Sequence, residues 1–323
     1  MTQLEMYEKK VLEGELLTKE DAMDLAKEDL ENLCEAANRI RKHFCGDAFD
    51  ICTIINGKSG KCSENCRYCA QSAFYDTKVE TYPLLSKKVV LEQAKYNEER
   101  GVLRYSIVTS GKRLNDEEVD KVCEMVKMIR EHTSISICGS FGLLGEEHFR
   151  KLKQAGLTRV HNNLETSREN FPNVCTTHTF EDKIEAIEAA KRAGLNVCSG
   201  GIMGLGETME DRINMVIAIR SMGIRSIPVN MLNPIPGTPY AKNKKLTNDD
   251  MRRIVAVFRF LVPNASIRLA GGRGLLPDKG RLCFMSGANA AISGDMLTTQ
   301  GITIEADMQM LKELGYKAVL WNE

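Results

Sequence analysis

The sequence has no net charge, no long apolar run and no low-complexity tract, and each absence excludes a class of protein. Its 323 residues include 44 basic and 44 acidic side chains, so the composition gives no sign of a nucleic-acid surface. No stretch of about 18 apolar residues could form a transmembrane helix. Residues 1–17 are acidic with a helical pattern, unlike the basic and then apolar start of a signal peptide. We therefore expect a cytosolic protein that binds neither nucleic acid nor a membrane.

A disulfide framework is also excluded, although cysteine is abundant. The chain has 11 cysteines, an odd number, and disulfides rarely persist in the cytosol. Hydrophobic residues make up 43% and charged residues 27%, which is typical of a soluble globular enzyme. The excess of cysteine therefore indicates metal or redox chemistry.

Short β-rich runs alternate with longer helical patterns, and no linker divides the chain. Helical patterns such as 115–132 and 180–194 carry apolar residues at the spacing of helices packed on a parallel sheet. The β-rich runs cover residues 49–57, 101–111, 133–141, 157–163, 195–204, 224–232, 265–272 and 282–292. Eight such units predict an α/β fold, a (β/α)8 TIM-type barrel with an N-terminal helical extension.

Three segments make up this predicted organisation. Residues 1–45 form N-terminal helices packed on the barrel, residues 46–315 form the barrel, and residues 316–323 form a C-terminal tail. The helical pattern over 304–315 predicts a closing helix at the end of the barrel.

Cys62, Cys66 and Cys69 form the motif C-x3-C-x2-C directly after the first predicted strand. In a (β/α)8 barrel the active site is built from the loops that follow the strands. Three thiolates hold three irons of a four-iron cluster and leave the fourth iron open to another ligand. A zinc site with a distant fourth ligand is the alternative, although structural zinc sites usually contain paired C-x2-C motifs.

A second group of cysteines lies on the predicted strands themselves. Cys52, Cys138 and Cys198 fall on the first, third and fifth strands, and Arg268 falls on the seventh. Alternate strands of such a barrel contribute one interior layer of four side chains, which is usually aliphatic. Three thiols and a guanidinium in that layer predict a buried cluster site, with coincidental core cysteines as the alternative. Cys175, in a loop, and Cys283, on the eighth strand, are weaker candidates.

The cysteine motif, with Tyr68 directly before Cys69, resembles the radical S-adenosylmethionine (SAM) superfamily, whose members bind SAM on the open iron of a 4Fe-4S cluster. Four further blocks resemble the biotin synthase family in sequence and order. They are "HNNLETS" (161–167), "CSGGIMGLGET" (198–208), "VNMLNPIPGTP" (229–239) and "CFMSGANA" (283–290). The resemblance extends over residues 30–315.

The resemblance also implies ligand contacts. For SAM these are Tyr68, Asn163, Glu165, Lys183, Gly201 and Gly204, and for the substrate they are Asn163, Asn230 and His161. Glycines allow backbone N–H groups to approach a ligand, a carboxylate suits ribose hydroxyls, and one amide can both donate to and accept from a cyclic urea. Two alternatives stay open, because the glycines can serve packing alone and Asn230 can cap a turn.

Better-known members of the family hold an auxiliary 2Fe-2S cluster with three cysteines and an arginine. This chain matches two of those cysteines, Cys138 and Cys198, and the arginine, Arg268. Ser106 stands in place of the third cysteine, and Cys52 stands where those members have Ser. The resemblance is to the anaerobe-type branch, which implies a 4Fe-5S cluster with a sulfide as sulfur donor. A 2Fe-2S cluster is the alternative.

The activity implied by the resemblance is radical sulfur insertion. Reductive cleavage of SAM would yield a 5′-deoxyadenosyl radical that abstracts hydrogen from dethiobiotin, and sulfur from the auxiliary cluster would complete biotin. A flavodoxin or ferredoxin electron donor and a homodimer are also expected. Two other functions stay open: a related radical SAM enzyme such as a hydrogenase maturase, and an iron–sulfur carrier or redox sensor.

Overall fold

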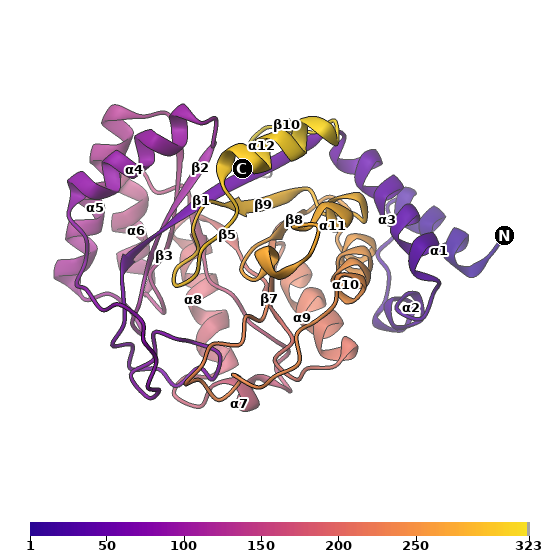
Figure 1. Ribbon diagram of the computed structural model, residues 1–323, viewed down its shortest axis with the longest axis horizontal. Helices are drawn as coiled ribbons and strands as arrows, with labels where there is room; N and C mark the ends of the chain where they lie inside the picture. Colours follow the sequence, from indigo (N-terminus) through magenta and orange to yellow (C-terminus); the bar gives the residue numbers. More distant parts are fainter. Residues whose placement is uncertain (322–323) are drawn as a thin grey trace.

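A parallel sheet curled into a barrel lies at the centre of the computed structural model, which describes residues 1–321 (Figure 1). Along the sheet the strands follow the order β5-β4-β3-β2-β1-β9-β8-β7-β6. Their bounds are β1 Ala48–Lys58, β2 Arg104–Thr109, β3 Ser136–Ser140, β4 Arg159–His161, β5 Asn196–Cys198, β6 Gly201–Met203, β7 Ser226–Met231, β8 Ser266–Leu269 and β9 Ala290–Ser293. The expected α/β barrel is confirmed as a TIM-like parallel barrel that is regular over only part of its circumference.

The irregular part is a break between β5 and β6, where one strand was expected over 195–204. β5 pairs with β4, β6 pairs with β7, and Ser199 and Gly200 separate the two strands. A Cβ atom on Gly200 would lie 1.9 Å from the carbonyl oxygen of Pro228, so the chain can pass this close to β7 only with glycine. The expected single strand is thus wrong, because the hydrogen bonding changes at Ser199 and Gly200. Beyond β5 the chain bonds to the turn at Glu165 on one side and to β7 on the other.

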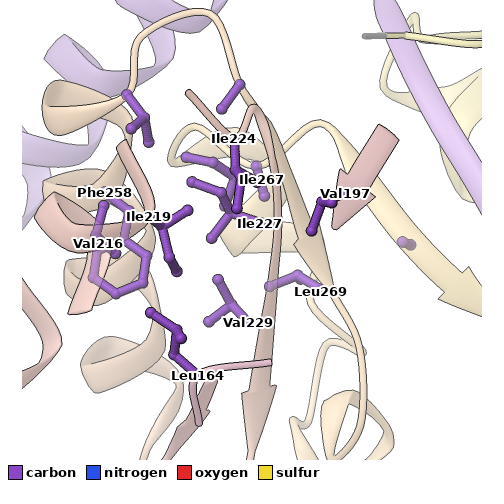
Figure 2. Packing of buried hydrophobic residues seen from close by; sticks show 14 of the residues in the cluster. Leu164, Val197, Val216, Ile219, Ile224, Ile227, Val229, Phe258, Ile267 and Leu269 are labelled. Carbon is purple, nitrogen blue, oxygen red and sulfur yellow. The ribbon is translucent and has the colours of Figure 1, made fainter. Parts of the chain in front are cut away.

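Helices cover the outside of the barrel. All of them except α6 begin after a Ser, Thr or Asn whose side chain accepts a hydrogen bond from the first helical turn. Their bounds are α4 Lys87–Glu99, α5 Asp116–His132, α6 Glu146–Ala155, α8 Phe180–Arg192, α9 Met209–Ser221 and α10 Asn248–Leu261. Figure 2 shows Ile219 of α9 and Phe258 of α10 packed toward Ile227 of β7, so the main core lies between the sheet and this helical layer.

Three N-terminal helices lie on one side of the barrel: α1 (Gln3–Leu12), α2 (Lys19–Leu25) and α3 (Leu30–Cys45) (Figure 1). α2 packs against α9 and α10, α3 packs against α10, and α1 packs against α3. Near the other end of the chain, α12 (Ile304–Glu313) is followed by β10 (Lys317–Ala318), which pairs in parallel with the start of β1. The expected C-terminal tail, 316–323, therefore contributes a short strand, and its residues 322–323 lie outside the described residues. No helix in the described part of the chain has the length and apolar character needed to cross a membrane.

The segment 282–292, expected to be one strand, begins as a helix. α11 spans Arg281–Met285 and β9 starts only at Ala290. The carboxylate of Asp278 accepts hydrogen bonds from the N–H groups of Gly280 and Leu282, which starts the helix. A short apolar run fits a buried strand and a buried helix equally well, and the capping carboxylate decides for the helix. Cys283 was expected on a barrel strand, and this expectation is wrong, because the residue is buried on α11.

Candidate active site at the carboxyl end of the barrel

A cavity of about 410 Å³ opens among the loops that follow the strands. Its wall includes residues of every strand from β1 to β9, together with residues of the loop after β1. Among the predicted site residues, those that line the cavity are Cys52, Cys62, Tyr68, Cys69, Ser106, Cys138, His161, Asn163, Glu165, Lys183, Cys198, Asn230 and Arg268. Residues far apart in the sequence therefore share one chamber.

The inner wall of this cavity contains the four residues expected to form one layer. Cys52, Cys138, Cys198 and Arg268 all line the cavity, and all four are buried. Ser106, on β2, lies directly opposite Cys138 in the sheet register and is also buried. The alternate-strand rule thus placed these side chains in a common chamber, although their role as cluster ligands stays a prediction.

Two further arginines and an aspartate, which the sequence analysis missed, surround this layer. Asp50 is fully buried, and its carboxylate lies 3.1 Å from the guanidinium groups of both Arg104 and Arg268. Arg159 donates from Nη1 to Ser226 Oγ at 3.4 Å. The sequence did contain a signal for these arginines. An arginine within a short buried strand is unusual, and one occurs on each of β2, β4 and β8.

The thiols themselves have polar partners. Arg104 Nη1 donates to Cys138 Sγ at 3.6 Å, and Ser226 Oγ donates to Cys198 Sγ at 3.3 Å. Cys52 Sγ donates to the carbonyl oxygen of its neighbour Thr53 at 3.3 Å. Hydrogen bonds to the sulfurs are one of the means by which proteins stabilise an anionic iron–sulfur cluster.

Charge shows that an anionic group fits this chamber. Burial alone would raise the pKa of Asp50, but Arg268 and Arg104 outweigh burial and hold its pKa below the ordinary value. Burial raises the pKa of Cys52 to about 12, so this thiol is neutral at pH 7 without a metal. The guanidinium groups of Arg104, Arg159 and Arg268 all line the cavity beside these thiols. Metal binding deprotonates thiols, so a cluster held by thiolates would place its negative charge next to these guanidinium groups.

The loop after β1 carries the other three cysteines. Cys62 and Cys69 line the cavity, whereas Cys66 is not among the described lining residues. The N–H of Cys69 donates to the carbonyl oxygen of Cys66, and the N–H of Cys62 donates to the carbonyl oxygen of Gln71. These two bonds hold a tight turn within the loop. The Sγ of Cys66 lies 3.7 Å from that of Cys175, which caps the end of α7 (Phe171–Val174). Cys175 is therefore a neighbour of this loop and not of the inner layer.

Tyr68, Glu165 and Asn163 form one hydrogen-bonded group on the cavity wall, the Tyr68 unit. Tyr68 Oη donates to Glu165 Oε1 at 3.0 Å, and Asn163 Nδ2 donates to Glu165 Oε2 at 3.2 Å. Asn163 Oδ1 in turn accepts from the N–H of Gly200 at 3.0 Å. Both oxygens of the carboxylate are thus fixed before any ligand binds.

The backbone at Glu165 is strained. Its φ is 71°, in the left-handed region that residues other than glycine seldom adopt. The strand expected over 157–163 ends earlier, because β4 stops at His161, and both Asn163 and Glu165 lie in the turn beyond it. Backbone hydrogen bonds to Gly200 and Ile202 hold the turn in place.

Three other predicted contacts also lie on the wall. Lys183 Nζ donates to Asn162 Oδ1 at 3.3 Å, which leaves further donors for an anion. Burial lowers the pKa of His161 to about 4, so its imidazole is neutral at pH 7. Asn230 donates to the carbonyl oxygen of Gly201 at 3.1 Å and accepts from the N–H of Gly271 at 2.9 Å. Its amide is therefore oriented by backbone on both sides.

Gly201 and Gly204 are not among the described residues that line the cavity. The N–H of Gly204 donates to Glu207 Oε1 at 2.8 Å and is therefore already satisfied. A Cβ atom on Gly201 would lie 2.4 Å from the carbonyl oxygen of Glu165, so this glycine permits close packing. The side chain of Ile202, between them, does line the cavity. The expected SAM contacts of both glycines stay predictions, and the packing alternative accounts for these observations.

Comparisons with known proteins agree with this arrangement. The family model for the Radical SAM superfamily matches residues 57–218, and the model for the Biotin and Thiamin Synthesis associated domain matches residues 228–317. The first region contains the three-cysteine loop and the second contains Asn230 and Arg268. The two matches together include most of the barrel.

Curated relatives match nearly the whole chain. The biotin synthase of Akkermansia muciniphila is 61% identical over 308 residues, covering 95% of this chain and 96% of the relative. That of Brachyspira hyodysenteriae is 60% identical over 317 residues, covering 98% of this chain and 95% of the relative. Among solved structures, a methylornithine synthase superposes with a TM-score of 0.84 at 21% identity, covering 97% of each chain. That likeness concerns the fold alone.

Proposed function

The chain belongs to the biotin synthase family of radical SAM enzymes, and on this premise we propose that it converts dethiobiotin to biotin with two iron–sulfur clusters held in one chamber. The observation that carries this proposal is the shared cavity. Cysteines of the outer loop, the inner thiols and the Tyr68 unit all line it. A reaction that needs SAM, the substrate carbon and a sulfur source close together requires such a chamber.

The outer loop is the proposed site of the 4Fe-4S cluster, with Cys62, Cys66 and Cys69 as ligands. With SAM bound and one electron from an external donor, such a cluster would cleave SAM to methionine and a 5′-deoxyadenosyl radical. Lys183 offers a positive charge for the SAM carboxylate, although a lysine lacks the paired donors of an arginine. Glu165, held by Tyr68 and Asn163, offers fixed acceptors to ribose hydroxyls. These side chains bind and orient, and the cofactor provides the difficult chemistry.

The inner wall is the proposed site of the auxiliary cluster, with Cys52, Cys138 and Cys198 as ligands. Three thiolates suit a four-iron cluster with an added sulfide, and we favour the 4Fe-5S form over 2Fe-2S. Arg104 and Ser226 donate to two of the three sulfurs, which stabilises a negatively charged group there. Asn230 and His161, both neutral and both on the wall, suit the uncharged ring of the substrate.

A product assay tests this proposal. Anaerobically reconstituted protein with SAM, a reductant and dethiobiotin is expected to yield both 5′-deoxyadenosine and biotin, measured by chromatography and mass spectrometry. A carrier or redox sensor would yield no 5′-deoxyadenosine. Another radical SAM enzyme would yield 5′-deoxyadenosine without biotin, and either result contradicts the proposal. The flavodoxin or ferredoxin donor, the homodimer and the cytosolic location stay predictions.

Replacement of Arg268 by Met tests whether this arginine is a cluster ligand. Its guanidinium pairs with Asp50, and its Nη1 donates to the carbonyl oxygens of Asp50 and Ala291. Since these contacts already engage it and three cysteines remain, we expect the variant to keep most of its auxiliary iron. Iron and sulfide analysis measures this, with Cys138→Ala as the control that should lose the cluster. Complete loss in the Arg268→Met variant would instead favour the two-iron cluster.

A further inference from the structure

Behind the three-cysteine loop lies a compact group of metal-binding side chains, of which the proposed reaction uses only Cys66. It consists of Cys66 from the loop and of Cys175 and His178 from the turn between α7 and α8. One donor atom from each residue lies within 4.8 Å of the others, and Cys175 and His178 are buried. A set of two thiols and an imidazole is one of the common zinc ligand sets.

Two of the three donor–donor distances within this group match those around a tetrahedral ion. Bonds of about 2.3 Å to sulfur and about 2.0 Å to nitrogen give a sulfur–sulfur edge near 3.8 Å and a sulfur–nitrogen edge near 3.5 Å. The Sγ atoms of Cys66 and Cys175 are 3.7 Å apart, and Cys175 Sγ lies 3.3 Å from His178 Nδ1. The two edges are therefore already at ligand spacing, whereas thiolates on different irons of a cubane lie much farther apart.

A carboxylate lies beside the group. Glu64 Oε2 lies 2.6 Å from His178 Nδ1, and Thr177 Oγ1 donates to the same oxygen at 2.8 Å. Glu64 is itself buried. This oxygen is not among the donors that already lie together, so it becomes a fourth donor only after the proton shared with the imidazole has left and the carboxylate has turned toward the ion.

We propose that the cluster-free protein binds one thiophilic divalent cation, Zn²⁺ or Fe²⁺, through Cys66, Cys175, His178 and Glu64. The binding step is independent of the proposed function. Its consequence rests on that function, because Cys66 is also a proposed ligand of the 4Fe-4S cluster. The ion and the cluster therefore exclude each other, and bound zinc blocks assembly of the outer cluster.

The test uses Co²⁺ as a probe, because thiolate ligands give cobalt intense charge-transfer absorption. The whole cluster-free chain is titrated anaerobically, and bound cobalt is counted after gel filtration. We expect the Cys62→Ala/Cys69→Ala variant, which retains Cys66, to bind as much tight cobalt as the unaltered chain. Cys175→Ser and His178→Ala should each bind one equivalent less, and added Zn²⁺ should displace that equivalent. Circular dichroism confirms that each variant is folded, and Cys123→Ser, altered on a distant helix, controls for loss of a cysteine.

Cluster assembly gives the second measurement. One equivalent of Zn²⁺ added before iron and sulfide should lower outer-cluster occupancy in the unaltered chain and have little effect in Cys175→Ser. The proposal is overturned if Cys175→Ser and His178→Ala bind as much cobalt as the unaltered chain, or if the ion is lost only when Cys62 and Cys69 are replaced. Neither result bears on biotin formation, so a failure of the proposed function would be recognised separately by the product assay.

Discussion

Replacement of Cys62, Cys66 and Cys69 together by Ala should abolish SAM cleavage and remove one of two clusters from the reconstituted protein. The open iron that binds SAM depends on these three thiolates, and no other side chain of the loop is a comparable iron ligand. Production of 5′-deoxyadenosine should fall below detection. Iron and sulfide analysis should show that about half of the cluster content remains, on the inner wall.

The matched control replaces the inner cysteines instead. Cys52, Cys138 and Cys198 line the cavity into which Cys62 and Cys69 also point, so their triple replacement removes equally many cysteines from the neighbouring proposed cluster site. This control should still cleave SAM. If the outer variant continues to form 5′-deoxyadenosine, the assignment of the outer loop is wrong, whatever its iron content.

The sequence alone predicted the sheet and the chamber well, because both depend on short-range patterns. Apolar runs of strand length recur with helical patterns between them, and a parallel barrel is their simplest packing. The layer of Cys52, Cys138, Cys198 and Arg268 followed from counting strands, since alternate strands share a layer. The break between β5 and β6 lies after Cys198 and divides one expected strand in two. Arg268 therefore lies on β8 and not on a seventh strand, and its side chain still lines the chamber.

The features that were missed depend on contacts between distant segments. Nothing local to Cys175 shows that its thiol lies 3.7 Å from that of Cys66, since 109 positions separate them. The pairing of Asp50 with Arg104 and Arg268 likewise joins strands far apart in the chain. The helix at Cys283 was missed for a different reason, because its start depends on a capping carboxylate beside an ambiguous apolar run.

The register of β1 and β2 makes Cys52 the most informative residue of the inner wall. Cys52 lies opposite Arg104 on β2, and Ser106 lies opposite Cys138 on β3. Cys52 and Ser106 both line the cavity and both are buried, so each is placed to contact a group held there. Only the thiol is a strong iron ligand, since soft thiolates are preferred over hydroxyls in iron–sulfur sites.

Replacement of Cys52 by Ala should therefore separate the two halves of the reaction. The inner cluster loses one of three thiolates, whereas the outer loop and the Tyr68 unit remain intact. SAM should still be cleaved, and hydrogen abstraction can continue with no competent sulfur source to trap the carbon radical. We expect 5′-deoxyadenosine at near-normal yield with biotin reduced below detection, together with loss of the auxiliary iron and sulfide.

Ser106→Ala is the matched control, because it removes one side-chain heteroatom from the neighbouring strand of the same wall. Its iron content and its ratio of biotin to 5′-deoxyadenosine should stay close to those of the unaltered chain. Full auxiliary-cluster occupancy with normal biotin formation in Cys52→Ala would show that Cys52 is not a ligand. Cys175 and Cys283 would not readily replace it, since one contacts the outer loop and the other lies on α11. Such a result would instead move the third ligand to Arg268 of the predicted layer or to Ser106 on the neighbouring β2, and a loss of iron in Ser106→Ala would identify the serine.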